Sequence, residues 1–192
     1  MMLNDKDVRK LLLSELQKKY QNDPNTKIIN ELGIDFGASR IDIAVVNGIL
    51  HGYEIKSDLD TLERLPRQMK YYNKLFQRMT IVSSRKYYNE VCELVPQWWG
   101  IKIISADGSR LIDKRKGRLK SSQNKELLLK LLWKKDLEKF IDYTNYPKSY
   151  KKYRKNKLIN LFKEEVSIEI IRPFVYSVLK ERNNNIYLIH QQ

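Results

Sequence analysis

The chain of 192 residues has a formal net charge of +14, 42% hydrophobic residues and a single cysteine. This length fits one ordinary domain or a catalytic core with a small appendage, and the apolar content excludes a chain too polar to fold. Because no apolar run approaches the ~20 residues of a membrane helix and one cysteine forms no internal disulfide, we expect a cytoplasmic protein without membrane contact.

The basic excess is concentrated in the C-terminal part of the chain. Residues 1–112 hold 17 basic and 14 acidic side chains, whereas residues 113–192 hold 20 and 9. Counterion release from phosphates drives sequence-independent binding, so this excess favours a polyanionic partner. We therefore predict a core over residues 1–112 and a basic helical segment over residues 113–192 that binds nucleic acid or packs on the core.

The N-terminal part predicts one helix followed by three strands. Apolar side chains at spacings of three and four indicate an amphipathic helix over residues 5–20, which the segment Asn22-Asp23-Pro24-Asn25 ends. The Asn47-Gly48 pair between two apolar runs is a strong hairpin signal. The three β-like runs cover residues 27–32, 40–46 and 49–56.

Helices and strands alternate after this meander. Helical patterns cover residues 61–76 and 86–94, and short strands are expected over residues 79–82 and 101–105. Pro66 indicates a break or a new first turn in the earlier helix. The order α-β-β-β-α-β-α-β predicts an α/β fold with a mixed sheet flanked by helices on both faces.

The C-terminal segment begins with a basic linker from about Leu111 and continues in helical patterns. These patterns cover residues 125–142, 157–165 and 167–182. Residues 146–155 interleave tyrosines with cations, which suits a phosphate backbone with bases stacked on the rings. An equal alternative is a solvated loop whose tyrosines cover the helix core. The candidate nucleic-acid contacts here are Lys151, Lys152, Arg154 and Lys155.

Asp42, Glu54 and Lys56 are the residues that most suggest chemistry. Hydrolysis of a phosphodiester needs charge neutralisation at the transition state, a metal that acidifies water, and a cation near the nucleophile. An aspartate facing Glu-x-Lys on the next strand would supply two carboxylates, one backbone carbonyl and one ammonium, which suits Mg²⁺. The alternative is an edge-strand charge at Asp42 and a surface pair at Glu54 and Lys56.

Strand parity decides whether these side chains can meet. Across a strict two-residue Asn47-Gly48 turn, Asp42 lies opposite Tyr53, and Glu54 points to the other face of the sheet. A three-residue loop or one β-bulge returns Asp42, Glu54 and Lys56 to a common face, so we expect an irregular hairpin. The hairpin side chains expected in the core are Ile41, Ile43, Val45 and Ile55.

These residues and the predicted order of elements resemble the PD-(D/E)XK nuclease superfamily over its whole α-β-β-β-α-β core. The resemblance implies that Asp42 and Glu54 bind the metal, that the carbonyl of Ile55 assists, and that Lys56 positions or polarises the attacking water. Ile41 stands where the superfamily pattern has a proline before the aspartate, a departure that many members share.

The chain is also similar to the RecB-like branch, which carries Gln-x-x-x-Tyr on the helix after the lysine strand. Gln68 and Tyr72 match this pattern one helical turn apart and would orient substrate, although a core Tyr72 beside a solvated Gln68 is the alternative. As a further metal ligand we prefer Glu31 to Glu15, because Glu31 interrupts an apolar run close to the hairpin. The added phosphate contacts expected near this site are Arg40, Arg67 and Lys70.

The resemblance implies a restriction-endonuclease-like fold and a metal-dependent nuclease that hydrolyses phosphodiester bonds, of DNA first, through a metal-activated water. It implies Mg²⁺ as cofactor with Mn²⁺ as a substitute, and endonuclease action ahead of exonuclease action. A homodimer fits the resemblance as well. Two alternatives stay open: a non-catalytic nucleic-acid-binding protein that keeps the fold, and an RNA nuclease.

Overall fold

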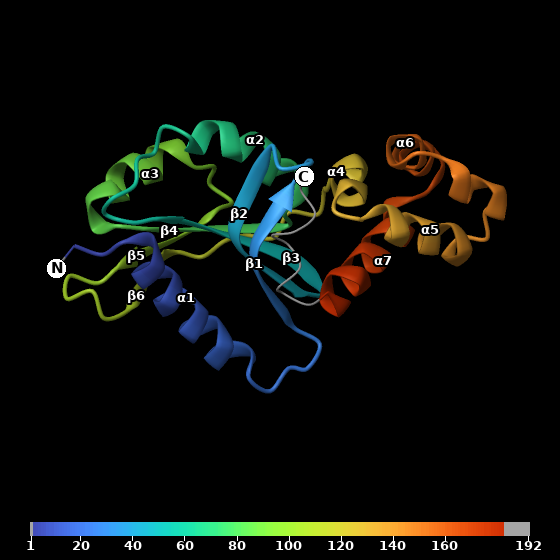
Figure 1. The fold of residues 1–192 in the computed structure, drawn as a ribbon. Helices are drawn as coiled ribbons and strands as arrows, with labels where there is room; N and C mark the ends of the chain where they lie inside the picture. The colour runs from blue at the N-terminus through green and yellow to red at the C-terminus, as the bar shows by residue number, and fades with distance from the viewer. Residues whose placement is uncertain (1, 183–192) are drawn as a thin grey trace.

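The computed structural model describes residues 2–182, which form a six-stranded sheet with helices on both faces (Figure 1). The elements of the first part are α1 (Asp5–Tyr20), β1 (Lys27–Ile34), β2 (Ser39–Asn47), β3 (Ile49–Lys56), α2 (Leu65–Leu75), β4 (Arg78–Ser83), η1 (Arg85–Tyr87), α3 (Tyr88–Leu94) and β5 (Gly100–Ile104). The later elements are β6 (Leu111–Arg115), α4 (Lys125–Lys130), α5 (Lys134–Tyr143), η2 (Lys148–Lys152), α6 (Lys155–Glu165) and α7 (Ile168–Glu181). The predicted α/β fold with a mixed sheet is confirmed.

The strands follow one another across the sheet in chain order. The first three form an antiparallel meander, β4 and β5 continue parallel to β3, and β6 returns antiparallel to β5. Strand β6 lies where the sequence predicted the start of a basic linker, so that prediction was wrong. The charged residues of β6 obscure the alternation of apolar and polar side chains that marks a strand. The strand is stabilised by pairing with β5, where Asp113 lies 3.0 Å from Lys102 across the ladder.

The helix expected over residues 125–142 is two helices, which is a second correction. Asn124 caps α4 by accepting a hydrogen bond from the amide of Leu127 at 2.9 Å. The Asp136 carboxylate accepts one from the amide of Trp133 at 2.8 Å, and this cap starts α5 afresh. Each cap satisfies an amide that a helix N-terminus leaves unpaired, so two capped helices replace one continuous helix.

Each face of the sheet packs against helices through its own hydrophobic cluster. Figure 1 shows α1 on one face and α2 with α3 on the opposite face. The α1 face buries Val8, Leu12 and Leu16 against side chains of β2 and β3, among them Tyr53 and Ile55. The opposite cluster extends without a break from the sheet and α2 into the helices α4 to α7. The C-terminal helices therefore share their core with the sheet.

Polar contacts reinforce this junction between the sheet and the C-terminal helices. The buried hydroxyl of Tyr176 on α7 donates to Oε1 of Gln77 at 2.8 Å, and the Lys120 amide donates to the Gln77 carbonyl at 2.7 Å. The division predicted between residues 112 and 113 falls inside β6. Within the described part of the chain, no helix is both long enough and apolar enough to cross a bilayer.

The buried ring of His51 makes stability depend on pH. Burial lowers the pKa of His51 to about 3, helped by the charge of Arg78. A histidine whose folded pKa lies below its unfolded value stabilises the fold above about pH 6.5 and loses this contribution as the pH falls. We expect about 2 kcal/mol of unfolding free energy to be lost through His51 between pH 7.5 and pH 5. Urea unfolding of His51→Gln should show a smaller acid loss than the parent, and equal losses would contradict the prediction.

Candidate functional site

The hairpin of β2 and β3 has the parity that the candidate site requires. Gly48, with a φ of +64°, is the single residue between the paired Asn47 and Ile49. This is the parity of a three-residue loop, and the left-handed φ suits glycine because it has no Cβ. Continued along the strands, the register sets Asp42 opposite Glu54. The prediction of an irregular hairpin is confirmed.

The sheet opens on both sides of Asp42. Pairing of β1 with β2 skips the facing positions Glu31 and Asp42, and pairing of β2 with β3 ends at Ile43. Glu31 adopts a φ of +54°, a conformation that few residues other than glycine take. The amide of Ile55 donates instead to Oδ2 of Asp42 at 2.7 Å. A carboxylate thus takes the place of a ladder carbonyl and leaves an opening at the sheet surface.

The opening also changes which way the neighbouring side chains face. All four hairpin side chains expected in the core are buried, but Ile41 packs in the α2 cluster whereas Ile43 and Val45 pack under α1. In an unbroken strand Ile41 and Ile43 would share one face. The expectation that all four lie in the core is confirmed, although β2 changes face at Asp42.

Arg9 on α1 holds Asp42, and sequence reasoning missed it. Its guanidinium donates to Oδ1 of Asp42 at 2.7 Å and to the Asp42 carbonyl at 2.8 Å. A further pair with Asp5 at 3.1 Å fixes the arginine one turn away on the same helix. The i, i+4 spacing of Asp5 and Arg9 was a visible signal, but only the fold brings this pair to a residue 33 positions later.

Glu54 is almost fully buried, and each of its oxygens has a partner. Its Oε1 accepts from Nζ of Lys56 at 2.8 Å, and Nζ also lies 3.3 Å from Oε1 of Gln68. Its Oε2 lies 2.8 Å from the hydroxyl of Tyr72. The Gln68 amide donates to this hydroxyl at 3.2 Å. The structure thus brings together the residues predicted from the Glu-x-Lys and Gln-x-x-x-Tyr patterns, and Tyr72 is also a core side chain.

The pKa values of both carboxylates are raised. Burial and the charge of Asp42 raise the pKa of Glu54 to about 7, against the opposing effect of Lys56. Burial also raises the pKa of Asp42, although the Ile55 amide and Arg9 oppose the shift. A raised pKa means that the ionised form is costly in this environment. Burial is the main cause at both positions, and the pairs with Arg9 and Lys56 oppose it.

The hydrogen bonds of the Tyr72 hydroxyl are consistent with a protonated Glu54. The oxygen lies 2.7 Å from the carbonyl of Arg40 as well as 2.8 Å from Glu54, and one hydrogen cannot serve both acceptors. When Glu54 carries a proton, its carboxyl group donates to the Tyr72 hydroxyl, and that hydroxyl donates to the backbone carbonyl of Arg40. When Glu54 is ionised, Tyr72 donates to one acceptor at a time.

A hollow of about 480 Å³ collects most of the predicted site residues. The predicted residues that line it are Glu31, Arg40, Asp42, Glu54, Ile55, Lys56, Arg67 and Gln68. Charged residues that the sequence did not single out also line it, namely Asp5, Arg9, Asp60 and Arg64. In residues 2–182 no three Asp, Glu, His or Cys side chains gather as a metal-ion cluster.

The two candidates for a further acid are placed differently. Glu31 lines the hollow and pairs with Arg40 at 3.5 Å. Glu15 on α1 pairs with Lys102 of β5 at 2.7 Å and does not line the hollow. The preference for Glu31 agrees with this placement, whereas a metal-binding role for Glu31 stays a prediction.

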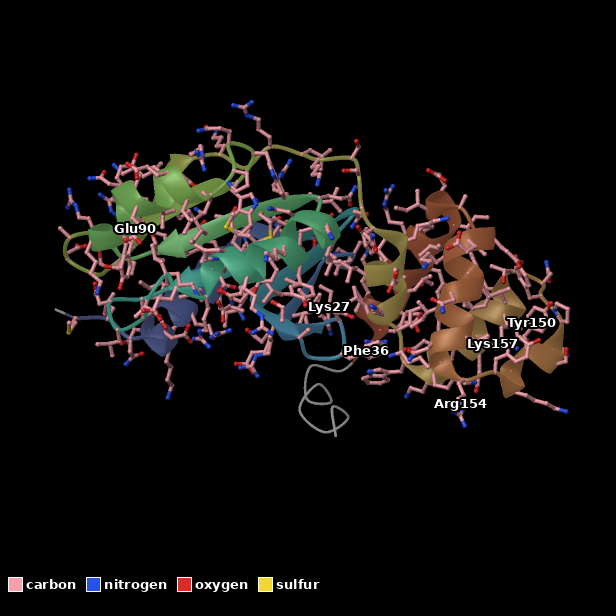
Figure 2. The ribbon with its side chains drawn as sticks, turned by 90° about the horizontal axis from the view of Figure 1, so that it is seen from above. Lys27, Phe36, Glu90, Tyr150, Arg154 and Lys157 are labelled. Carbon is pink, nitrogen blue, oxygen red and sulfur yellow. The ribbon has the colours of Figure 1, made fainter. Side chains whose placement is uncertain are left out.

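The basic tyrosine segment lies apart from the opening. Figure 2 shows Tyr150 and Arg154 among the C-terminal helices, away from the sheet. Tyr146, Tyr150 and Tyr153 are partly buried against the core, as the loop alternative proposed. Lys151 binds Asp142 at 2.6 Å, so its charge is already paired. Lys152 and Arg154 are exposed, and Lys155 begins α6 beside the β1–β2 turn.

Comparisons with known proteins identify a family that this chain matches. A family model described as Bacteriophage P4 protein cII matches residues 2–192. Protein cII of Enterobacteria phage P4 is 32% identical over 183 residues, which cover 94% of this chain and 68% of that protein. A solved protein of unknown function from Silicibacter pomeroyi is similar with a TM-score of 0.42 and 18% identity, over 59% of this chain and 73% of that one. A similarity this low does not assign a fold.

Proposed function

This chain belongs to the family of the bacteriophage P4 protein cII, and we propose that it is a metal-dependent nuclease that hydrolyses phosphodiester bonds, of DNA first. The name of the relative says nothing of a substrate, so the proposal rests on the site. One observation carries it: Asp42, Glu54 and Lys56 meet where the sheet opens, and Gln68 joins them at the rim. This set and the order of elements support a restriction-endonuclease-like fold.

The donor set fits Mg²⁺, with Mn²⁺ as a substitute. Asp42, Glu54 and the carbonyl of Ile55 are oxygen donors, which hard divalent cations prefer. Burial raises the pKa of Asp42 and of Glu54, so their ionised forms are costly without a cation, and a divalent cation beside them would stabilise the ionised forms. Each carboxylate oxygen has two lone pairs, so the hydrogen bonds described above leave acceptor capacity. When bound, the cation lowers the pKa of a water and neutralises charge on the phosphate.

The protein side chains supply the rest of the chemistry. The Lys56 ammonium, fixed between Glu54 and Gln68, is placed to stabilise negative charge on a phosphate or an attacking oxygen. Tyr72 holds the Glu54 carboxylate, and Arg9 holds Asp42, so both acids are oriented before substrate arrives. Arg64 and Arg67 line the same hollow and can bind flanking phosphates.

A cleavage assay tests the proposal. The full chain is incubated with closed-circular and linear, single- and double-stranded DNA and RNA, each with Mg²⁺, Mn²⁺ or EDTA. We expect cleavage that needs a divalent cation and that opens closed circles, since the hollow is open to solvent and does not require a chain end. Absence of cleavage of every substrate with both metals would sink the proposal, and preference for RNA would reassign the substrate.

One observation favours a second candidate function. The acids at the opening already bind Arg9 and Lys56, and a stable ion-pair network of this kind also suits a protein that binds nucleic acid without cutting it. This alternative predicts binding without turnover. The same assay separates the two functions when a binding measurement accompanies it.

A further inference from the structure

Phe36 is an exposed aromatic side chain held in a strained turn. It lies between β1 and β2, the strands that carry Glu31 and Asp42, and its side chain is 54% exposed. Asp35 and Phe36 have φ values of +50° and +54°, which bulky residues rarely adopt. Figure 2 shows Phe36 where the sheet meets the C-terminal helices. An exposed apolar ring on a backbone with unfavourable φ values costs stability, and such features often mark functional sites.

The turn that carries Phe36 is fixed and positively flanked. Nζ of Lys130 on α4 pairs with Oδ1 of Asp35 at 2.7 Å, which ties the turn to the C-terminal helices. The ammonium of Lys155 lies 4.7 Å from the centroid of the Phe36 ring, and that of Lys130 lies 5.6 Å from it. Lys130 also pairs with Glu126 at 2.7 Å, so it ties the turn to α4, and Lys155 is the second cation beside the ring.

A basic stripe connects this turn with the candidate active site. Arg67, Lys70 and Lys74 recur at spacings of three and four on the exposed face of α2. Among residues 2–182 none of the three forms an ion pair with a carboxylate, so their charges are free for a ligand. Arg67 lines the hollow at Asp42, and all three line a second hollow of about 530 Å³ that also includes Asp35 and Lys130.

We propose that this stripe carries a single-stranded or locally unpaired nucleic acid away from the opening at Asp42, and that one unpaired base stacks on Phe36. The inference rests on the proposed function for its substrate and goes further by naming the form of that substrate. Arg67, Lys70 and Lys74 bind successive phosphates, and Lys155 binds the phosphate beside the stacked base. In a duplex every base face is already stacked, so Phe36 has nothing to bind.

Magnitudes favour stacking over the present contacts of the ring. A cation–π contact on an exposed ring, such as that of Lys155 with Phe36, is worth about a twofold to fivefold effect on an equilibrium. Stacking of a base on an aromatic ring is worth about 5- to 150-fold. A base can therefore displace a lysine from the ring face, and the displaced ammonium remains within reach of the adjacent phosphate.

The test measures binding in the absence of cleavage. Fluorescence anisotropy follows a labelled single strand and its duplex binding to the Asp42→Asn chain in EDTA. Phe36→Ala should weaken binding of the single strand about 5- to 150-fold and leave the duplex unchanged, while Phe36→Trp keeps the parent affinity. Leu119→Ala is the matched control, because Leu119 is exposed to 57% and belongs to neither hollow.

An abasic scan makes the assignment specific. Removing one base at a single position of the strand should weaken binding as much as Phe36→Ala does. The two losses of affinity should not add when both changes are combined. Lys74→Gln should reduce the salt dependence of binding by about 0.7 in the log–log slope. The inference is overturned when Phe36→Ala binds the single strand like the parent, or when each abasic loss persists in full in Phe36→Ala.

Failure of the inference and failure of the proposed function give different results. If single-strand affinity depends on Phe36 but the wild-type chain shows no metal-dependent cleavage, the inference is supported and the proposed nuclease function is rejected. Metal-dependent cleavage with no effect of Phe36→Ala on single-strand binding keeps the nuclease and overturns the inference. Circular dichroism of Phe36→Ala, compared with Leu119→Ala, shows that both variants are folded.

Discussion

Replacing Asp42 by asparagine should lower the rate of metal-dependent cleavage by about a thousandfold or more while DNA affinity in EDTA changes less than about threefold. Asparagine has the shape of aspartate and keeps an acceptor for the Ile55 amide, while its amide nitrogen replaces the oxygen that accepts from Arg9. It loses the negative charge that, under the proposed function, holds the cation. The expected loss in cleavage therefore comes from turnover, and urea unfolding measures the separate cost of the lost Arg9 pair.

Lys56→Ala should have a similar effect on cleavage for a different reason. Lys56 is buried with Glu54, and its removal leaves a buried carboxylate whose pKa, already about 7, rises further. Glu54 is then protonated at neutral pH and is lost as a donor to the cation, together with the ammonium. Urea unfolding of both variants accompanies the rate measurement, because an unfolded protein would mimic the loss of activity.

A carboxylate outside the hollow gives the control. Asp113 on β6 pairs with Lys102 at 3.0 Å and is largely exposed, so Asp113→Asn should keep the parent rate. The rates are measured on the substrate that the wild-type chain cuts best. Cleavage by Asp42→Asn at the parent rate would remove Asp42 from the mechanism and, with it, the proposed metal site.

Local patterns in the sequence predict the elements and the pairing of this site well. Asn47-Gly48 indicates the hairpin, and counting residues on each side shows that Asp42 meets Glu54 only when the turn is irregular. Both inferences use information within fifteen residues of the turn. The helical spacing of Gln68 and Tyr72 is equally local, which is why their approach to Glu54 and Lys56 was predictable.

Other features depend on contacts between distant parts of the chain. Arg9 reaches Asp42 only after α1 packs on the sheet, and no pattern around Arg9 marks that contact. The change of face at Asp42 occurs opposite Glu31, whose left-handed conformation lies on the neighbouring strand. Strand β6 forms because β5 offers it a partner. Phe36 looked unremarkable in sequence, since its exposure and backbone strain exist only in the fold.

Replacing Arg182 by methionine should lower the free energy of unfolding by about 3–5 kcal/mol. Arg182 follows α7, and its guanidinium donates to the Asp136 carboxylate and, at 2.9 Å, to the carbonyl of Leu131. Both charged side chains are only 6% exposed. Without the arginine, Asp136 is a buried charge that lacks its cation, and the cost is much larger than for a surface pair.

A second variant shows whether charge is the cause. Asp136→Asn removes the charge and keeps an acceptor for the Trp133 amide, so adding it to Arg182→Met should recover part of the lost stability. Lys163→Met breaks the half-buried, solvent-accessible pair with Glu126 at 3.5 Å and should change stability by less than about 1 kcal/mol. A loss this small in Arg182→Met would contradict the prediction.

The same unfolding curves test how the chain is divided. If residues 113–192 form an independent domain, Arg182→Met should unfold them first and produce two transitions. One hydrophobic cluster joins the C-terminal helices to the sheet, and the bond from Tyr176 to Gln77 crosses the junction. We therefore expect one transition at lower urea with an unchanged slope. Fluorescence of Trp99 in the sheet cluster and of Trp133 beside Arg182, each isolated by replacing the other tryptophans with phenylalanine, should then report the same midpoint.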